Sequence, residues 1–160
     1  MSVTFNKSGL DEIMKDVKTM FSTEGMYELS NEAVNHFINN FNLQGFDGDP
    51  WVKGMKEVGA TLVLSGQLRN SIRTLKVTDN SFTIISDTEY SEIHNEGGII
   101  PITPSMRKFF WAMYYKTNNE DWKWLALTQG TSITIPQRKF MGDSEVLNQH
   151  LADFSKKYFK

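Results

Sequence analysis

The chain opens with apolar side chains at three- and four-residue spacing, so residues 1–44 predict a lead-in of two amphipathic helices. Ser30 is a favourable N-cap for the second of these helices, and Asn40 falls on its polar side. The break near Gly25 is open to another interpretation, a single kinked helix. Glycine inside a helix costs only about 1 kcal/mol relative to alanine, and either arrangement buries nearly the same face.

An alternating pattern replaces the helical period in the middle of the chain. Apolar and polar side chains alternate over residues 75–78 and 82–85, on either side of a tight connection at residues 79–80. Residues 99–102 and 131–135 are further extended segments. These segments predict a small antiparallel sheet of three to five strands.

Further helical patterns lie between and after the strands. Residues 90–96 predict a short helix that stops at Gly97, and residues 143–160 predict a C-terminal helix. Another helix is predicted to start at Thr103 and Pro104. We expect its apolar stripe to be buried, and the stripe consists of Met106, Phe109, Phe110 and Met113.

These patterns together predict an α+β fold in a single domain, with helices packed on one face of the sheet. The expected parts are the helical lead-in at 1–44, a sheet region with an inserted aromatic helix at 62–142, and the C-terminal helix at 143–160. Residues 45–51 are rich in turn formers and predict a loop, with Trp51 inserted as an anchor. A chain of 160 residues is long enough to bury a core without covalent staples.

Composition narrows the possible chemistry. The sequence has no cysteine, which excludes disulfides, thiolate catalysis and thiolate metal sites and agrees with a reducing compartment. The formal net charge is −2, so no global positive field recruits nucleic acid. The N-terminus lacks the apolar run of a signal peptide, and no stretch is long enough to predict a membrane span. We therefore expect a soluble intracellular protein.

The candidate catalytic groups favour a structural interpretation. His94 and Glu96 have the spacing found in zinc deaminases, but that chemistry also needs two cysteine ligands. The other histidines lie far away in sequence, so we expect no metal. We expect the acidic residues at 87–96 to serve helix electrostatics, with subunit contacts as the next alternative and catalysis as the least favoured. No phosphate-binding glycine motif is present, so no cofactor is expected.

Two short basic strips give a weak case for contact with DNA. One lies at residues 69–76 and the other combines residues 107–108 with 138–139. Phosphate contact needs only well-placed cations. We favour subunit salt bridges and solvated charge over DNA, because both strips have acidic or aromatic neighbours.

Three motifs in a fixed order point to a known family. Residues 65–72 read Ser-Gly-Gln-Leu-Arg-Asn-Ser-Ile, residues 90–98 read Tyr-Ser-Glu-Ile-His-Asn-Glu-Gly-Gly, and residues 135–142 read Ile-Pro-Gln-Arg-Lys-Phe-Met-Gly. Together and in this order, they resemble the motifs of the phage virion morphogenesis family. The resemblance spans the chain from Leu64 to the C-terminus. Asn95 and Lys139 stand where family members usually have glutamine and proline. The resemblance assigns assembly or turn roles to Gly66, Arg69, Ser71, His94, Gly97, Gly98, Arg138 and Phe140.

The resemblance implies a non-enzymatic structural protein of a tailed phage or prophage, which completes the tail or joins it to the head by ring assembly. Its implied partners are other copies of itself and neighbouring head or tail proteins, with at most weak contact to DNA. Its implied location is the host cytoplasm during assembly and then the virion neck or tail. The alternative is a nucleic-acid-binding packaging accessory protein, and a cell-wall hydrolase ranks third.

The aromatic segment between the second and third motifs predicts where partners bind. One face of a short helix cannot hide all of its aromatic side chains, and surplus aromatics are frequent anchors of protein interfaces. We expect at least two of four residues to remain partly exposed, namely Trp111, Tyr114, Trp122 and Trp124. We also expect Arg69 and Arg138 to bind carboxylates near residues 89–96 or the next subunit.

Overall fold

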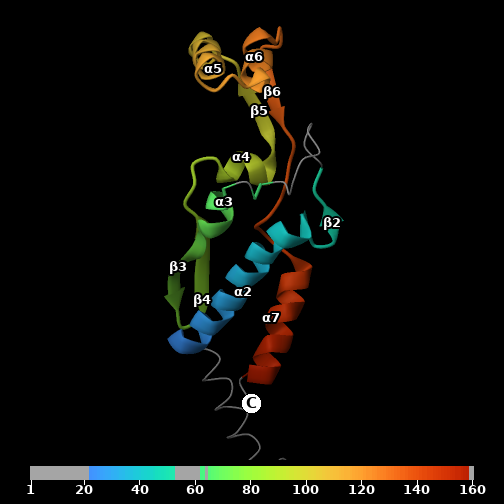
Figure 1. The fold of residues 1–160 in the computed structure, drawn as a ribbon. Helices are drawn as coiled ribbons and strands as arrows, with labels where there is room; N and C mark the ends of the chain where they lie inside the picture. Colours follow the sequence, from blue (N-terminus) through green and yellow to red (C-terminus); the bar gives the residue numbers. More distant parts are fainter. Residues whose placement is uncertain (1–21, 53–61, 64, 159–160) are drawn as a thin grey trace, which may run out of the picture.

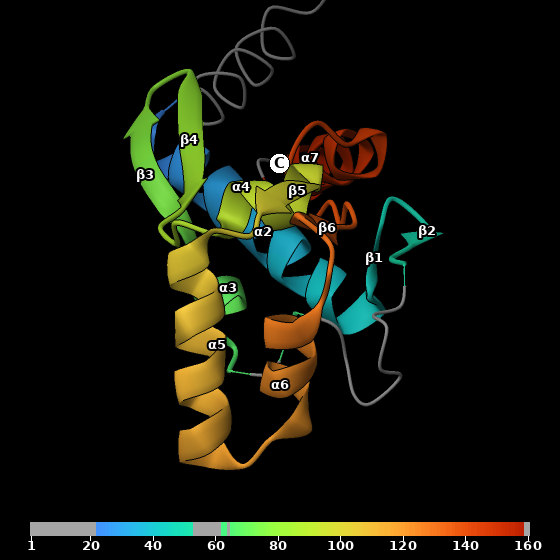
Figure 2. The same ribbon diagram turned by 90° about the horizontal axis from the view of Figure 1, so that it is seen from above.

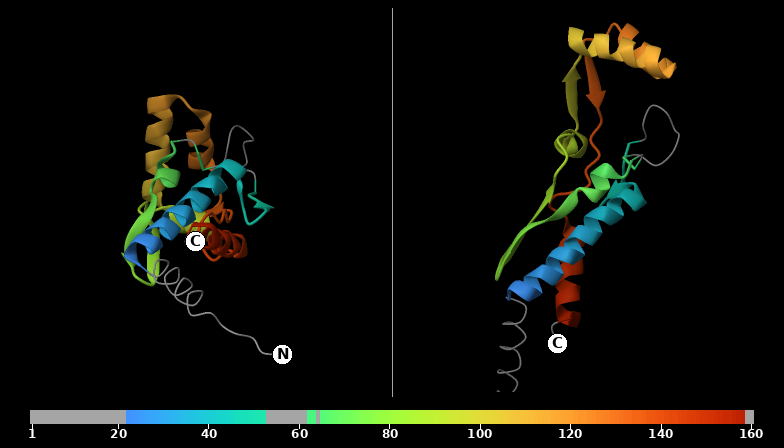
Figure 3. Two further views of the ribbon diagram at one scale, coloured as in Figure 1. Left: turned by 90° about the horizontal axis from the view of Figure 1, so that it is seen from below. Right: turned by 60° about the vertical axis from the view of Figure 1, so that its left-hand side comes forward.

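The computed structural model describes residues 22–52, 62–63 and 65–158 (Figure 1). The first predicted helix, at residues 10–21, lies outside the described residues. The described part is α+β, as predicted, and combines helices with short antiparallel strand pairs. It is elongated, with a body at one end and an arm that rises from the body (Figures 1 and 3).

Helix α2, Thr23–Leu43, runs diagonally through the body and buries one face, which includes Ala33, Phe37 and Phe41. The predicted N-cap at Ser30 is wrong, because the helix begins earlier and Ser22 caps it by accepting a hydrogen bond from the Gly25 amide. Gly25 therefore lies inside the helix and does not end one. Ser30 is completely buried, and its hydroxyl donates to the Tyr27 carbonyl.

A short strand pair and a single helical turn follow α2. Strands β1, Gly45–Phe46, and β2, Asp49–Pro50, form a tight hairpin in the segment predicted as a loop. Helix α3, Gln67–Asn70, then leads into the main hairpin.

The main hairpin pairs β3, Ile72–Thr78, with β4, Ser81–Ser86, as the alternating pattern predicts. Its register shifts between Thr74 and Lys76, so Leu75 has no cross-strand partner. This bulge turns Leu75 outward, where it is 55% exposed although the simple alternation assigns it to the apolar face. Helix α2 packs against both strands.

The C-terminal helix α7, Glu145–Tyr158, lies beside α2 and completes the body (Figure 1). Ser144 is buried and caps it by accepting a hydrogen bond from the Leu147 amide. His150 Nε2 lies 2.9 Å from a Glu32 carboxylate oxygen and links α7 to α2. The main core combines residues from α2, β1, α3, β3 and α7 with two from connecting segments: Ala33, Phe37, Phe41, Phe46, Trp51, Leu68, Ile72, Phe140 and Leu147.

The arm begins after helix α4, Ser91–Glu96. Strands β5, Gly98–Pro101, and β6, Ser132–Ile135, pair along their full lengths and carry two helices at their far end. These are α5, Pro104–Thr117, and α6, Glu120–Leu127, which lie side by side (Figure 2). Among the described residues, the strands thus form three separate two-stranded sheets, not the single sheet of three to five strands that the pattern predicts.

Candidate functional site

The second and third sequence motifs meet where α4 contacts residues 137–141, a contact that we call the motif joint. The Arg138 amide donates a 2.8 Å hydrogen bond to the His94 carbonyl at the end of α4. The Asn95 side-chain oxygen accepts two more, from the Phe140 and Met141 amides, each at 3.0 Å. One amide side chain therefore fixes two consecutive backbone groups of the third motif.

Phe140 is the centre of the motif joint and is only 1% exposed. Its carbonyl accepts a 3.1 Å hydrogen bond from the Asn40 side chain, and its ring lies 5.2 Å from the Phe41 ring. The prediction that Asn40 faces outward is wrong, because it is 2% exposed and holds this carbonyl. Trp51 acts as the predicted anchor, since its indole N–H donates to the Lys139 carbonyl at 2.6 Å.

Arg138 is buried in the motif joint, with 8% of its surface exposed. Its Nε donates to the Val52 carbonyl at 3.1 Å, and burial lowers the pKa of its guanidinium. The expected pairing with carboxylates near residues 89–96 is not found for Arg138 or Arg69 within the described ranges. Arg138 therefore contacts backbone and core, and Arg69, which is partly exposed, lies beside the Gly66 turn.

His94 faces inward from α4. Its Nδ1 is buried and has no hydrogen-bond partner, and its ring lies 5.8 Å from the Tyr90 ring. Burial lowers the pKa of His94, and the charge of Arg138 lowers it further. A cavity of about 150 Å³ beside it is lined by Leu62, Ser65, Leu68, Tyr90 and His94, so the first motif also reaches this region.

The motif glycines and Ser71 form the turns at which these elements meet. Gly66 precedes α3 with φ +68°, and Gly97 ends α4 with φ +73°, a region that favours glycine. A Cβ on Gly97 would lie 2.8 Å from the Gln137 amide nitrogen. Gly98 begins β5, and Ser71 links the end of α3 to β4 through hydrogen bonds of 2.7 Å to the Leu68 carbonyl and the Ser86 hydroxyl.

An open pocket of about 300 Å³ lies directly outside the motif joint, and we call it the α4 pocket. Its apolar side chains come from β4 and the third motif, and Glu92 and Glu96 contribute carboxylates from α4. Both glutamates are exposed. The lining residues are Ile84, Ile85, Ser86, Ser91, Glu92, Asn95, Glu96, Phe140 and Met141.

The helices of the arm are held together by aromatic packing. Phe110 is buried, and its ring stacks on the Trp122 ring with centroids 6.1 Å apart. The Arg107 guanidinium crosses from α5 to donate to the carbonyls of Ala126, Thr128 and Gly130. These contacts give the end of the arm its own small core.

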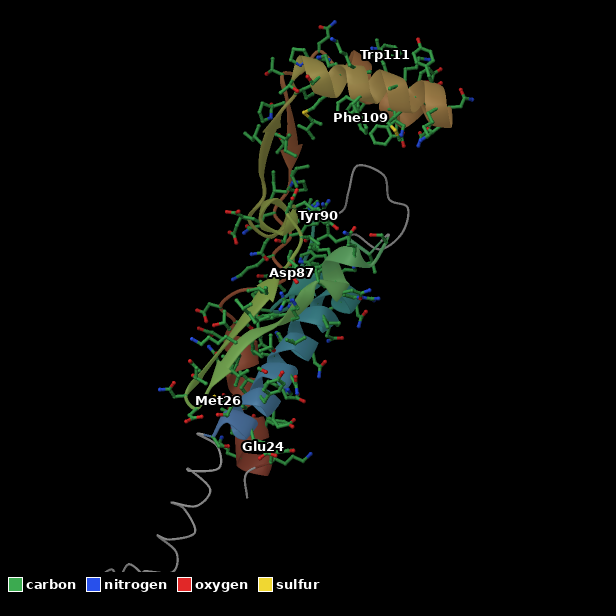
Figure 4. The ribbon with its side chains drawn as sticks, turned by 90° about the vertical axis from the view of Figure 1, so that its left-hand side faces the viewer. Glu24, Met26, Asp87, Tyr90, Phe109 and Trp111 are labelled. Carbon is green, nitrogen blue, oxygen red and sulfur yellow. The ribbon has the colours of Figure 1, made fainter. Side chains whose placement is uncertain are left out.

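The arm leaves much aromatic surface in solvent. Trp111, Tyr114 and Trp122 are partly exposed and Trp124 is 58% exposed, which confirms that at least two of the four are not fully buried. The prediction that the whole apolar stripe of α5 is buried is wrong, because Phe109 is 53% exposed. Phe109 points toward the body and Trp111 points away from it (Figure 4).

The two basic strips predicted from the sequence are partly used in internal contacts. Arg73 pairs with Asp87 at 2.5 Å, and Arg107 binds three carbonyls. Lys139 Nζ donates to the Asp143 carbonyl and lies over the Phe46 ring. The described residues include no group of three or more histidine, aspartate or glutamate side chains placed to hold a metal ion. They also include no helix long and apolar enough to cross a membrane.

These features define an α+β protein in which three short motifs form the turns and the joint of the body, and in which an arm exposes large aromatic side chains. The chain belongs to the phage virion morphogenesis family, whose model matches residues 7–160. It therefore has a role in assembling a phage virion. No curated protein and no solved structure matches the chain significantly.

Proposed function

We propose that this protein is a non-enzymatic subunit of a ring that completes the phage tail or joins it to the head. Family membership supports a role in virion assembly, and the arm supports a role carried out through protein contacts. In the assembled particle the protein would lie at the neck or tail.

The observation that carries the proposal is the separation of the arm from the body. The described members of the main core all come from the body, and none comes from residues 103–130. The end of the arm nevertheless exposes large apolar side chains, including Tyr115 at 79%, Trp124 at 58% and Leu127 at 58%. Large exposed aromatic groups that the body does not need for its own packing are typical of interfaces.

Complementation of a phage that lacks this gene tests the proposal. The test variant replaces residues 103–130 with Asn-Gly, a two-residue turn that suits the antiparallel pair β5 and β6. Because the main core is retained, we expect this variant to fold but to leave heads and tails unjoined or tails unfinished in negative-stain electron microscopy. Wild-type titre and normal particles from the variant would contradict the proposal.

The matched control changes a large exposed apolar residue in the body, Leu43→Ser. Leu43 is 69% exposed and is the last residue of α2, in the body. We expect normal particles from this control. Unfolding of the arm deletion, measured by circular dichroism, would show that the arm stabilises the body and would also contradict the reasoning.

A further inference from the structure

We propose that one side of α5 binds the α4 pocket of a second copy of this chain. The surface that binds, which we call the outer α5 face, lies away from α6 and consists of Lys108, Trp111, Ala112, Tyr115 and Lys116. The proposed contact rests on the ring role proposed above and assigns the two surfaces that meet in the ring.

The outer α5 face combines an aromatic platform with two available cations. Tyr115 is 79% exposed, and its ring stacks on Trp111 with centroids 6.0 Å apart, so its orientation is already restricted. Lys108 and Lys116 are exposed, and the described part of the chain gives neither of them a carboxylate partner. This face therefore suits an apolar surface with a negatively charged rim.

The α4 pocket has the complementary character. Ile84, Ile85 and Met141 provide apolar surface, while Glu92 and Glu96 provide carboxylates one helical turn apart. Neither glutamate forms an ion pair with another described residue. The Tyr115 ring would pack on the apolar surface of the pocket. The two lysines of the outer α5 face would then lie beside the two glutamates, so the charges would also be complementary.

Charge also distinguishes the outer α5 face from the other exposed side of the arm. The exposed side of α6 carries Trp124 and Leu127, but the first turn of that helix contains Glu120 and Asp121. Placing this side near Glu92 and Glu96 would bring like charges together, which disfavours a complex. Charge complementarity therefore selects α5 as the helix that binds the pocket.

The arm and the pocket must belong to different copies. Paired strands from Gly98↔Ile135 to Pro101↔Ser132 hold α5 at the far end of the arm, whereas α4 and β4, which line the pocket, lie below the arm (Figure 3). Contact within one chain would require this strand pair to open. A contact between two different surfaces of identical chains is head-to-tail, and it closes into a ring when the rotation between copies permits.

Reciprocal charge reversal tests this contact with the purified full chain. The arm variant carries Lys108→Glu and Lys116→Glu, and the pocket variant carries Glu92→Lys and Glu96→Lys. A control with Asp49→Lys and Asp143→Lys makes the same charge change as the pocket variant at exposed positions elsewhere on the body. Sedimentation velocity over a range of concentrations measures self-association, and circular dichroism confirms that each variant is folded.

We expect the wild type and the control to form closed oligomers, and we expect each variant alone to associate at least about tenfold more weakly, because like charges then face each other. An equimolar mixture of the two variants should assemble again, since each reversed arm meets a reversed pocket. A monomeric wild type, a pocket variant that assembles like the control, or a mixture that stays dissociated would each overturn the inference.

The outcomes separate this inference from the proposed function. Rings that assemble equally well in all variants would overturn the pairing of α5 with the α4 pocket but leave the ring role intact. Normal infectious particles without the gene would instead refute the proposed function itself.

Discussion

Replacing Gly97 by alanine tests the motif joint at its tightest point. Gly97 has φ +73° and ψ 173°, a combination that is nearly restricted to glycine. The added Cβ would lie 2.8 Å from the Gln137 amide nitrogen, 3.1 Å from its Cα and 3.2 Å from its Cβ. Two of these three atoms belong to the backbone, so a change of side-chain rotamer cannot relieve the overlap.

Two costs contribute to the expected loss of stability. The backbone conformation costs about 1–3 kcal/mol for a residue with a side chain. Overpacking against Gln137 adds about 1–3 kcal/mol. The free energy of unfolding should therefore fall by about 2–6 kcal/mol, and the melting temperature of a chain this size should fall by about 5–20 °C.

Gly48→Ala is a matched control for the backbone cost alone. Gly48 has φ +91°, but a Cβ there would meet nothing within 4 Å. Urea unfolding followed by circular dichroism should show that Gly97→Ala destabilises the chain more than Gly48→Ala does, by about the overpacking cost of 1–3 kcal/mol. Equal losses for the two variants would refute the close contact between Gly97 and Gln137.

Three further predictions concern the motif joint and the arm. Asn95→Ala should cost about 2–4 kcal/mol in urea unfolding, because two amides lose their acceptor. Asn95→Asp should cost less than Asn95→Ala, because it keeps the acceptor, although it loses the hydrogen bond from the Asn95 amide to the Glu96 carboxylate. Burial lowers the pKa of His94, so below about pH 6.5 this residue binds fewer protons in the folded chain than in the unfolded chain. The contribution of His94 to the free energy of unfolding should therefore be greatest above about pH 6.5 and fall as the pH drops below it. His94→Gln should reduce this slope between pH 7.5 and 5.5, and an unchanged slope would contradict the assignment. Tyr115→Ser should leave the melting temperature within about 2 °C but lower phage titre in complementation, and a normal titre would count against the outer α5 face.

The hydrophobic pattern predicts the elements well where their period is strong. The hairpin of β3 and β4, the start of α5 at Thr103 and Pro104, and the C-terminal helix all follow from local sequence. The start of α2 does not follow from local sequence, because Ser22 and Ser30 are both chemically suitable N-caps. Ser30 is instead buried, and its hydroxyl satisfies a carbonyl within the helix.

The motif joint depends on long-range contacts that a local pattern does not contain. Asn40 is polar and lies among other asparagines, so the sequence favours an exposed position, yet it binds a carbonyl 100 residues away. Asn95 is similar, because its role appears only when residues 140 and 141 are placed beside it. The single predicted sheet is also wrong for a long-range reason, since β5 and β6 pair with each other and extend away from the body.

Cryo-electron microscopy of the neck and tail of an infectious particle is the decisive test of the proposed ring. We expect a ring of identical α+β subunits at the tail end or the head-to-tail junction, with the arm of each subunit in contact with its neighbour. A mature particle that lacks this protein at both positions would contradict the proposed function. A ring in which every arm remains free in solvent would contradict the role assigned to the arm.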